Sequence, residues 1–288
     1  MNYTIMHIIN YTYNTPVKQS INQCILRPIH DVDQQCLKHT NKIEPNEFVY
    51  DYLDYWGNTV ETFYMKEPHH DLRITTQSLV SVNRKFPDGQ LQLDMNDWDK
   101  LSQQYAEFLK KTSFTDLPDS VLKDLTDPIW DSSIDAFDYV NKVNTYIYEM
   151  FEYESGSTNV ETTAQAFFNH KKGVCQDFTH LMLCMCRYKG IPARYVSGYV
   201  YCGQDSALRG DAAMHAWIEV MLPGMGWVGL DPTNRIYALD QHIRVAVGRD
   251  YLDIVPVKGV YIGGDQTMTV NVSVSQIVDY VPEPLDGQ

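Results

Sequence analysis

The sequence predicts an α+β protein in which an all-β sandwich or barrel precedes a region of mixed helices and strands. The first ~95 residues carry short runs of aromatic and β-branched residues separated by turn signals, a pattern typical of antiparallel β domains. Helical periodicity begins at about residue 133, and strand patterns return near residue 193. We therefore expect an N-terminal β domain at 1–95, a helical linker at 96–135 and a mixed domain with C-terminal strands at 136–288.

Five strands are expected in the N-terminal domain, because runs rich in Tyr, Thr, Ile and Val end at Pro, Asn or Gly. They cover residues 3–13, 20–28, 47–55, 59–65 and 72–82. The turn signal Trp-Gly-Asn at 56–58 separates the third run from the fourth and predicts a hairpin there.

The second half of the chain alternates between helix and strand patterns. Apolar residues recur every three or four positions over 133–151, which predicts an amphipathic helix. A short helix is expected at 163–170, and a longer one begins at Cys175 and stops before Gly190. Strands are expected at 193–201, 213–222, 226–231, 242–247, 259–262 and 267–274.

The charge and cysteine content exclude several functional classes. The chain has 37 acidic and 23 basic residues, a net charge of −14, whereas nucleic-acid and anionic-membrane binding need a basic surface. No apolar run is long enough for a transmembrane helix, and the N-terminus lacks the pattern of a signal peptide. We therefore expect a cytoplasmic protein with six reduced cysteines. Because no Cys-x-x-Cys occurs, a structural zinc site and a thiol-redox role are disfavoured.

Cys175 is the first candidate functional residue. It follows Gly173 and Val174 at the expected start of a helix, where unpaired N–H groups and a partial positive potential favour a thiolate. Glycine at 173 would permit a tight turn that presents the sulfur. The placement alone fits a structural, half-buried cysteine equally well.

His215 is the candidate base. Ala216, Ile218 and Val220 alternate along a strand and should face a core, so His215 and Trp217 should face the other way, toward a cleft. An ordinary surface histidine is the alternative. His180 is nearer to Cys175 in sequence, but it lies about 140° around the same helix and cannot readily take the thiol proton.

Asp231 ends the strand at 226–231 and precedes Pro232. If Leu222 pairs with Gly226, Asp231 lies opposite Trp217 and becomes a diagonal neighbour of His215 on the same face. A register shifted by one residue would place the two side chains on opposite faces. A simpler alternative is that Asp231 only caps the turn before Pro232.

Several segments together resemble the transglutaminase-like superfamily. The segment 173–180 resembles its nucleophile region, 190–199 the strand that follows, and 215–220 and 226–234 its His and Asp regions. The likeness is strongest over about 139–235. The segments 11–28 and 242–251 also resemble bacterial transglutaminase-like cysteine proteases.

This resemblance implies a papain-like core, a helix carrying Cys175 packed on an antiparallel sheet, with a catalytic Cys175-His215-Asp231 triad in the 136–288 domain. We expect neither a metal nor a cofactor, because the sequence has no P-loop, G-x-G-x-x-G or H-E-x-x-H motif. The backbone N–H of Cys175 is a candidate oxyanion donor. A second donor is not fixed by the sequence; Tyr139, Tyr146, Tyr148 and Tyr153 are candidates, although packing explains tyrosines equally well. Gln176 and Trp217 are expected to line the cleft.

We therefore expect a cysteine-dependent acyl-transfer enzyme whose partner is a peptide or protein amide, with neither nucleic acid nor membrane as a partner. A triad of this kind acts through a thioester, and hydrolysis by a peptidase or amidase is the expected outcome. A transglutaminase or deamidase is one alternative. A non-catalytic binding scaffold is the alternative from another class. The sequence does not indicate an oligomeric state.

Overall fold

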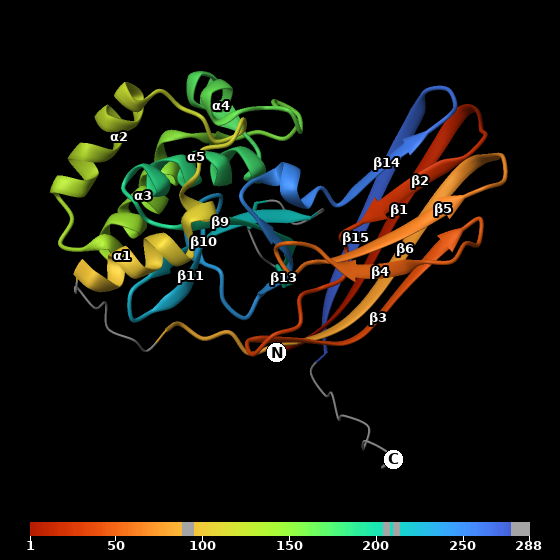
Figure 1. Ribbon diagram of the computed structural model, residues 1–288, viewed down its shortest axis with the longest axis horizontal. Helices are drawn as coiled ribbons and strands as arrows, with labels where there is room; N and C mark the ends of the chain where they lie inside the picture. Colours follow the sequence, from red (N-terminus) through yellow and green to blue (C-terminus); the bar gives the residue numbers. More distant parts are fainter. Residues whose placement is uncertain (88–94, 204–207, 210–213, 278–288) are drawn as a thin grey trace, which may run out of the picture.

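The computed structural model describes residues 1–87, 95–203, 208–209 and 214–277. Two parts lie side by side, one built of long strands and the other of helices that cover a sheet (Figure 1). The predicted α+β class with a β-rich N-terminal part is confirmed.

The N-terminal part is a sandwich of two four-stranded antiparallel sheets. Its N-terminal strands are β1 (Asn2–Val17), β2 (Ser20–Cys24), β3 (Gln34–Glu44), β4 (Tyr50–Leu53), β5 (Thr59–Met65) and β6 (His69–Val82). The C-terminal strands β14 (Val257–Tyr261) and β15 (Gln266–Ile277) complete it, giving the orders β15-β1-β6-β3 and β14-β2-β5-β4. Alternate residues of β1 are buried, and with apolar residues of β2, β5 and β6 they form the core between the sheets.

The predicted domain boundary at the C-terminal end is wrong. β14 pairs with β2 along its whole length, and β15 pairs with β1 from Gln266 to Ile277. Each of these strands satisfies the backbone groups of a sandwich strand, so residues 257–277 belong with the N-terminal sheets rather than with the second part. The remaining predicted residues, 278–288, lie outside the described chain.

The second part contains a five-stranded antiparallel sheet of order β12-β11-β10-β9-β13. Its strands are β9 (Ala193–Val200), β10 (His215–Leu222), β11 (Gly226–Asp231), β12 (Ile236–Tyr237) and β13 (His242–Gly248). The helices are α1 (Met95–Gln104), α2 (Asp119–Asp131), α3 (Ala136–Met150), α4 (Ala164–His170) and α5 (Cys175–Tyr188). Short parallel strands β7 (Glu152–Tyr153) and β8 (Lys172–Gly173) and 3₁₀ helices at 106–109 and 251–254 connect them. The predicted start of β10 at residue 213 lies outside the described residues.

Helix α5 lies at the centre of this part and is buried from Gln176 to Arg187. It packs on β9 and β10 and is covered by α2, α3 and α4. The segment predicted as a helical linker does contain helices, but it is not a linker: Leu122 of α2 belongs to the core, and Arg187 of α5 donates to the Lys110 carbonyl at 3.1 Å. Apolar residues of α2 therefore add to the core around α5.

The central strand β10 is buried on both faces. Ala216, Ile218 and Val220 face α5, as their alternation predicts. On the opposite face, Trp217 belongs to a second small core, and Glu219 is fully buried. The sequence predicted that this second face borders a cleft, and that prediction is wrong for Trp217. A strand in the middle of a sheet can be covered on both sides, and alternation alone does not reveal the second cover.

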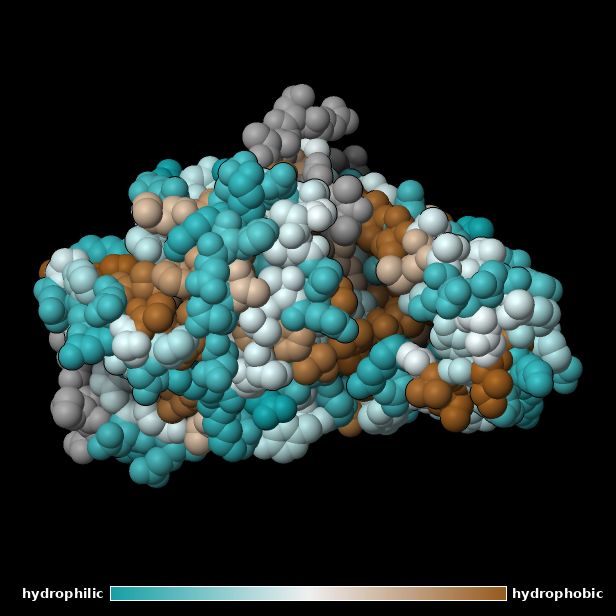
Figure 2. Space-filling model, turned by 90° about the horizontal axis from the view of Figure 1, so that it is seen from above, coloured by the Kyte–Doolittle hydropathy of each residue, from teal (hydrophilic) through white to brown (hydrophobic). Residues whose placement is uncertain are grey.

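The surface seen from above is mostly hydrophilic, with hydrophobic areas on both halves of the molecule (Figure 2). One apolar hollow of about 400 Å³ lies on the outer face of the β14-β2-β5-β4 sheet, where Ile21, Tyr50 and Val260 are exposed. None of the described helices is both long enough and apolar enough to span a membrane.

Candidate active site

Cys175 is the first residue of α5 and is half-buried. The preceding residue, Val174, has extended backbone and is held by Asp177, whose Oδ2 accepts the Val174 N–H at 2.9 Å and the Thr158 hydroxyl at 2.6 Å. The Asp177 N–H binds the Val174 carbonyl at 2.9 Å, whereas the N–H groups of Cys175 and Gln176 precede the first bonds of the helix and point toward the region in front of it. The thiol therefore lies at the positive end of the helix dipole with its backbone firmly fixed.

Gly173 is required for a different reason than the sequence suggested. Its φ is not in the left-handed region. A Cβ at this position would lie 2.6 Å from Asp177 Oδ2 and 2.7 Å from the Phe167 ring. The absence of a side chain therefore allows the strand before Cys175 to pass close to the carboxylate that holds the helix start, whereas an unusual turn conformation is not involved.

The β10–β11 hairpin has the register that the sequence predicted. Leu222 pairs with Gly226 and Ile218 with Leu230. The three-residue connection contains Gly224, which with Gly226 adopts positive φ values of 76° and 72°. Extending this register places Asp231 diagonally opposite His215, on the same face of the sheet.

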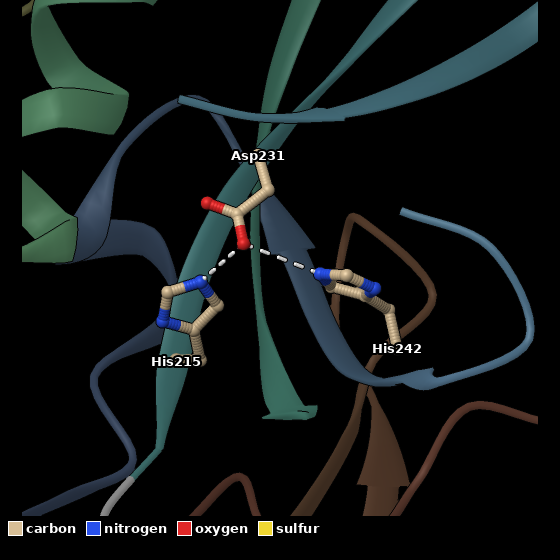
Figure 3. A group of neighbouring side chains, drawn as sticks. All are labelled: His215, Asp231 and His242. Carbon is tan, nitrogen blue, oxygen red and sulfur yellow. Dashed lines mark hydrogen bonds and ion pairs between the residues drawn. The ribbon is translucent and has the colours of Figure 1, made fainter. Parts of the chain in front are cut away.

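Asp231 is fully buried and accepts hydrogen bonds on both carboxylate oxygens. Oδ1 accepts the backbone N–H groups of Thr233 at 2.9 Å and Asn234 at 3.3 Å, so the residue does cap the turn. Oδ2 lies 2.8 Å from His215 Nε2, 2.8 Å from Asn234 Nδ2 and 3.3 Å from His242 Nε2. Figure 3 shows the carboxylate between the two imidazoles. The turn-capping and imidazole-orienting roles are therefore carried by different oxygens of one side chain.

The electrostatics of His215 favour a protonated ring. Burial lowers the pKa of His215, but the charge and hydrogen bond of Asp231, with a smaller contribution from Cys175, raise it to about 10. Burial raises the pKa of Asp231, yet the neighbouring His215 and His242 bring it well below its usual range. Asp231 is therefore a carboxylate that stabilises an imidazolium beside it.

The two ring nitrogens of His215 have different surroundings. Nε2 donates to Asp231, whereas Nδ1 points away from that carboxylate and has no well-aligned partner among the described residues (Figure 3). Cys175 lies close enough to act on the ring. With Nε2 protonated, a neutral His215 has its lone pair on Nδ1, the nitrogen free to take a thiol proton. This arrangement can support nucleophilic catalysis by a cysteine.

Comparison with known proteins shows the family and the fold of this chain. Residues 123–232 match the model of the transglutaminase-like superfamily, and residues 3–81 match that of the bacterial transglutaminase-like N-terminal region. An uncharacterized protein of Mycobacterium leprae is 30% identical over 273 residues, covering 91% of this chain and 94% of that protein. The chain belongs to the transglutaminase-like superfamily.

Two further similarities extend this result. A crystal structure of a candidate cysteine protease from Cytophaga hutchinsonii superposes with a TM-score of 0.80 and 22% identity, covering 99% of this chain and 94% of that one. This transglutaminase-like chain therefore shares its whole fold, sandwich included, with a solved structure. A protein-glutamine gamma-glutamyltransferase of Pseudomonas aeruginosa is 30% identical over 86 residues, covering 28% of this chain and 13% of that protein.

Two residues predicted to line the cleft of this transglutaminase-like domain have other contacts. Trp217 is fully buried; its ring stacks behind His215 with centroids 6.2 Å apart and meets His242 edge-on at 5.0 Å. It therefore supports the imidazoles from behind, and the prediction that it lines an open cleft is wrong. Gln176 is nearly buried, and its side-chain amide donates to the Val160 carbonyl at 3.1 Å.

Other sequence candidates also find structural roles. The Tyr139 hydroxyl donates to the Met185 carbonyl at 3.0 Å, so packing of α3 on α5 explains this tyrosine. His180 is fully buried and its Nε2 accepts the Tyr251 N–H at 3.3 Å; burial lowers its pKa to about 3. A histidine that stays neutral and bonded in the core is not a base for Cys175, as its angle on the helix predicts.

Sequence reasoning missed His242. It was expected only as the first residue of a strand, and no spacing in the sequence connects it to Asp231, eleven residues earlier. Possible metal-ligating atoms of His215, Asp231 and His242 lie within 4.8 Å of one another, the one such group among the described residues. We interpret it as a hydrogen-bonded cluster, because both Nε2 atoms face the same carboxylate oxygen at hydrogen-bond distance.

Proposed function

We propose that this protein is a cysteine-dependent acyl-transfer enzyme that acts on amide substrates, with hydrolysis by a peptidase or amidase as its main outcome. Cys175 is the nucleophile, His215 the base and Asp231 the residue that orients the base. The observation that carries this proposal is the 2.8 Å bond between His215 Nε2 and Asp231 Oδ2. It assigns the proton to Nε2 and leaves Nδ1 for the thiol.

Before the attack, His215 Nδ1 holds the proton given up by Cys175, and Asp231 stabilises the imidazolium of this thiolate–imidazolium pair. The sulfur attacks the amide carbonyl carbon and forms a tetrahedral oxyanion. We assign the stabilisation of that charge to the N–H of Cys175, which lies at the start of α5. The C–N bond then breaks, the imidazolium protonates the departing amine, and a thioester remains on Cys175.

In the second step the neutral imidazole removes a proton from water, whose oxygen attacks the thioester carbon. The C–S bond breaks, the acid leaves, and the proton returns to the sulfur through His215. A primary amine in place of water would give transamidation. We favour water because it is far more concentrated than any amine, and excluding it requires a closed tunnel above the thioester.

Transamidation or deamidation of glutamine is the second candidate. The 86-residue similarity to a protein-glutamine gamma-glutamyltransferase favours it. The same triad performs both reactions, since they differ only in the acceptor of the acyl group. The substrate in either case is a peptide or protein amide. We place the reaction in the cytoplasm, because all six cysteines are free and the nucleophile must stay reduced.

Intact-mass analysis after incubation with peptide pools tests the proposal. An acyl adduct on Cys175, released as an acid without amine and as an amide with a primary amine, is expected. Cys175→Ala must lose the adduct, whereas Cys36→Ala, which removes another half-buried thiol, must keep it. An adduct that persists in Cys175→Ala would contradict the proposal. So would the complete absence of an adduct with both peptide substrates and glutamine amides, and a binding scaffold would then be the better interpretation.

A further inference from the structure

The second imidazole beside Asp231 has no role in the reaction as written above. His242 is 1% exposed and lies at the start of β13, while His215 and Asp231 come from β10 and β11. Its Nε2 is 3.3 Å from Asp231 Oδ2, the same oxygen that binds His215. Figure 3 shows His242 on the opposite side of this oxygen from His215.

His242 must donate its proton to Asp231. An ionised carboxylate accepts hydrogen bonds but has no proton to donate, so the contact requires a proton on His242 Nε2. Burial lowers the pKa of His242, and its hydrogen bond with Asp231 only partly opposes this effect. The ring is therefore neutral near pH 7, with its proton on Nε2 and a bare Nδ1 that has no partner within the described chain.

A glycine in β9 allows β13, and with it His242, to lie close to Asp231. Gly198 of β9 pairs with His215 on one side and with Arg244 on the other. A Cβ on Gly198 would lie 2.1 Å from the Ile243 carbonyl oxygen and 2.6 Å from the Trp217 ring. Glycine at this position therefore lets the backbone of β13 and the Trp217 ring approach β9 together. His242 and Trp217 then pack edge-on at 5.0 Å behind the imidazole of His215.

We propose that His242 is a positioning residue that holds Asp231 Oδ2 toward His215 from the far side and thereby keeps the thiolate–imidazolium pair of the active site formed. This inference rests on the proposed function. Oδ1 already accepts the backbone N–H groups of the turn, so the direction of Oδ2 depends on its own three donors, His215, His242 and the Asn234 side chain. Without His242, the carboxylate oxygen loses a donor in a site from which solvent is excluded, and its hold on the imidazolium weakens.

Other charged or titratable groups near this cluster are few. Within the described chain, Cys175 of α5 acts on His215, and Arg84, after β6, acts on His242. Neither offers Asp231 a replacement donor.

The test measures the rate at which iodoacetamide alkylates Cys175, followed by peptide mapping, at pH 6 and pH 9.5. At pH 6 a thiolate depends on the neighbouring imidazolium, whereas at pH 9.5 an ordinary thiol is largely ionised as well. The informative pair is His242→Gln and His242→Asn. The Gln amide reaches the position of Nε2 and can replace the donor, whereas the Asn amide reaches only that of Nδ1. His242→Leu removes the donor while nearly keeping the volume.

The Asn and Leu variants should react about tenfold more slowly than wild type at pH 6, with the Gln variant within about threefold, and all should converge at pH 9.5. His7→Leu is the matched control, because His7 is also a buried histidine and bonds the Tyr199 hydroxyl at 2.9 Å, away from Asp231. It should leave both rates unchanged. If His242→Leu does not fold, the two amide variants decide the question.

The experiment distinguishes failure of the role of His242 from failure of the proposed function. An Asn variant as reactive as wild type at pH 6, or a Gln variant that falls as far as the Asn variant, would overturn the role of His242 alone. A wild-type protein whose Cys175 reacts no faster at pH 6 than Cys36 would instead overturn the proposed function on which this role depends.

Discussion

Replacing Asp231 by Asn separates the two roles that this side chain combines. The backbone N–H groups of Thr233 and Asn234 require an acceptor at Oδ1, so the amide oxygen should take that position. The NH₂ group then replaces Oδ2 and faces three donors, from His215, His242 and the side chain of Asn234. His215 can bond it only by accepting at Nε2, which moves the ring proton to Nδ1 and removes the base from Cys175.

The size of both effects follows from these contacts. Activity should fall on the order of 10²–10⁴-fold, as expected when a triad histidine is held in the wrong tautomer. The buried donors of His242 and Asn234 lose their acceptor, and a loss of about 1–3 kcal/mol in unfolding free energy is expected. The turn should persist because its cap is retained, so the variant should remain folded at 25 °C.

The assay pairs the steady-state rate on a substrate found by the peptide screen with urea unfolding of the same sample. Asp250→Asn is the matched control: Asp250 is also a buried cap, with Oδ1 accepting the Leu252 N–H at 2.8 Å, but it does not contact the triad. Because its amide oxygen can replace Oδ1, Asp250→Asn should keep its cap and lose little stability or rate. If Asp231→Asn loses activity only in proportion to its unfolded fraction, or no more than Asp250→Asn does, Asp231 is merely a turn cap and the catalytic assignment is wrong.

Three further outcomes are expected. Limiting iodoacetamide at pH 7 should label Cys175 before the other five cysteines, as judged by peptide mapping, since burial raises the pKa of four of them and Cys202 is not at a helix start; preferential labelling elsewhere would contradict this. The pKa of His215 is raised from 6.5 to about 10. Its contribution to the stability of the folded protein is therefore complete below about pH 6.5 and is lost as the pH rises through about 10. Over this pH window the melting temperature of the wild type should fall more than that of Asp231→Asn. Glu219→Gln should cost about 3–5 kcal/mol in urea unfolding, because it leaves the buried arginines around Glu219 without their carboxylate, and a cost below 1 kcal/mol would show that solvent reaches them.

The hairpin that carries His215 and Asp231 could be predicted because its determinants are local. The turn at 223–225 fixes which residues of β10 and β11 pair, and side-chain alternation then places His215 and Asp231 on one face. The helix beginning at Cys175 and ending before Gly190 is likewise specified by its own stop signals, and the structure ends it at Tyr188.

The features that the sequence did not reveal depend on distant contacts. β3 (Gln34–Glu44) has few apolar residues and is a strand because its backbone pairs with the edge of β6. The pairing of β15 with β1 joins residues more than 250 positions apart, and β15 reads equally well as a strand of either part. His242 reaches Asp231 only because β13 pairs with β9, two strands away from β11. Local patterns contain no information on these pairings.

The buried charges of β10 indicate why the sandwich and the triad sheet occur together. Glu219 lies on the same face of β10 as His215. It contacts Arg84, which follows β6, and forms an ion pair with Arg194 of β9 at 2.6 Å. Arg244 of β13 extends this cluster to Asp31, which precedes β3, at 2.6 Å. Glu219, Arg84 and Arg244 are buried and costly to bury alone, so the cluster is stable only when residues from the sandwich and from the sheet are both in place. Because His215, His242 and Glu219 lie on the strands that this cluster joins, separating the two parts would loosen the imidazoles as well as unpair the charges. The sandwich therefore contributes to the geometry of the proposed triad through these buried charges.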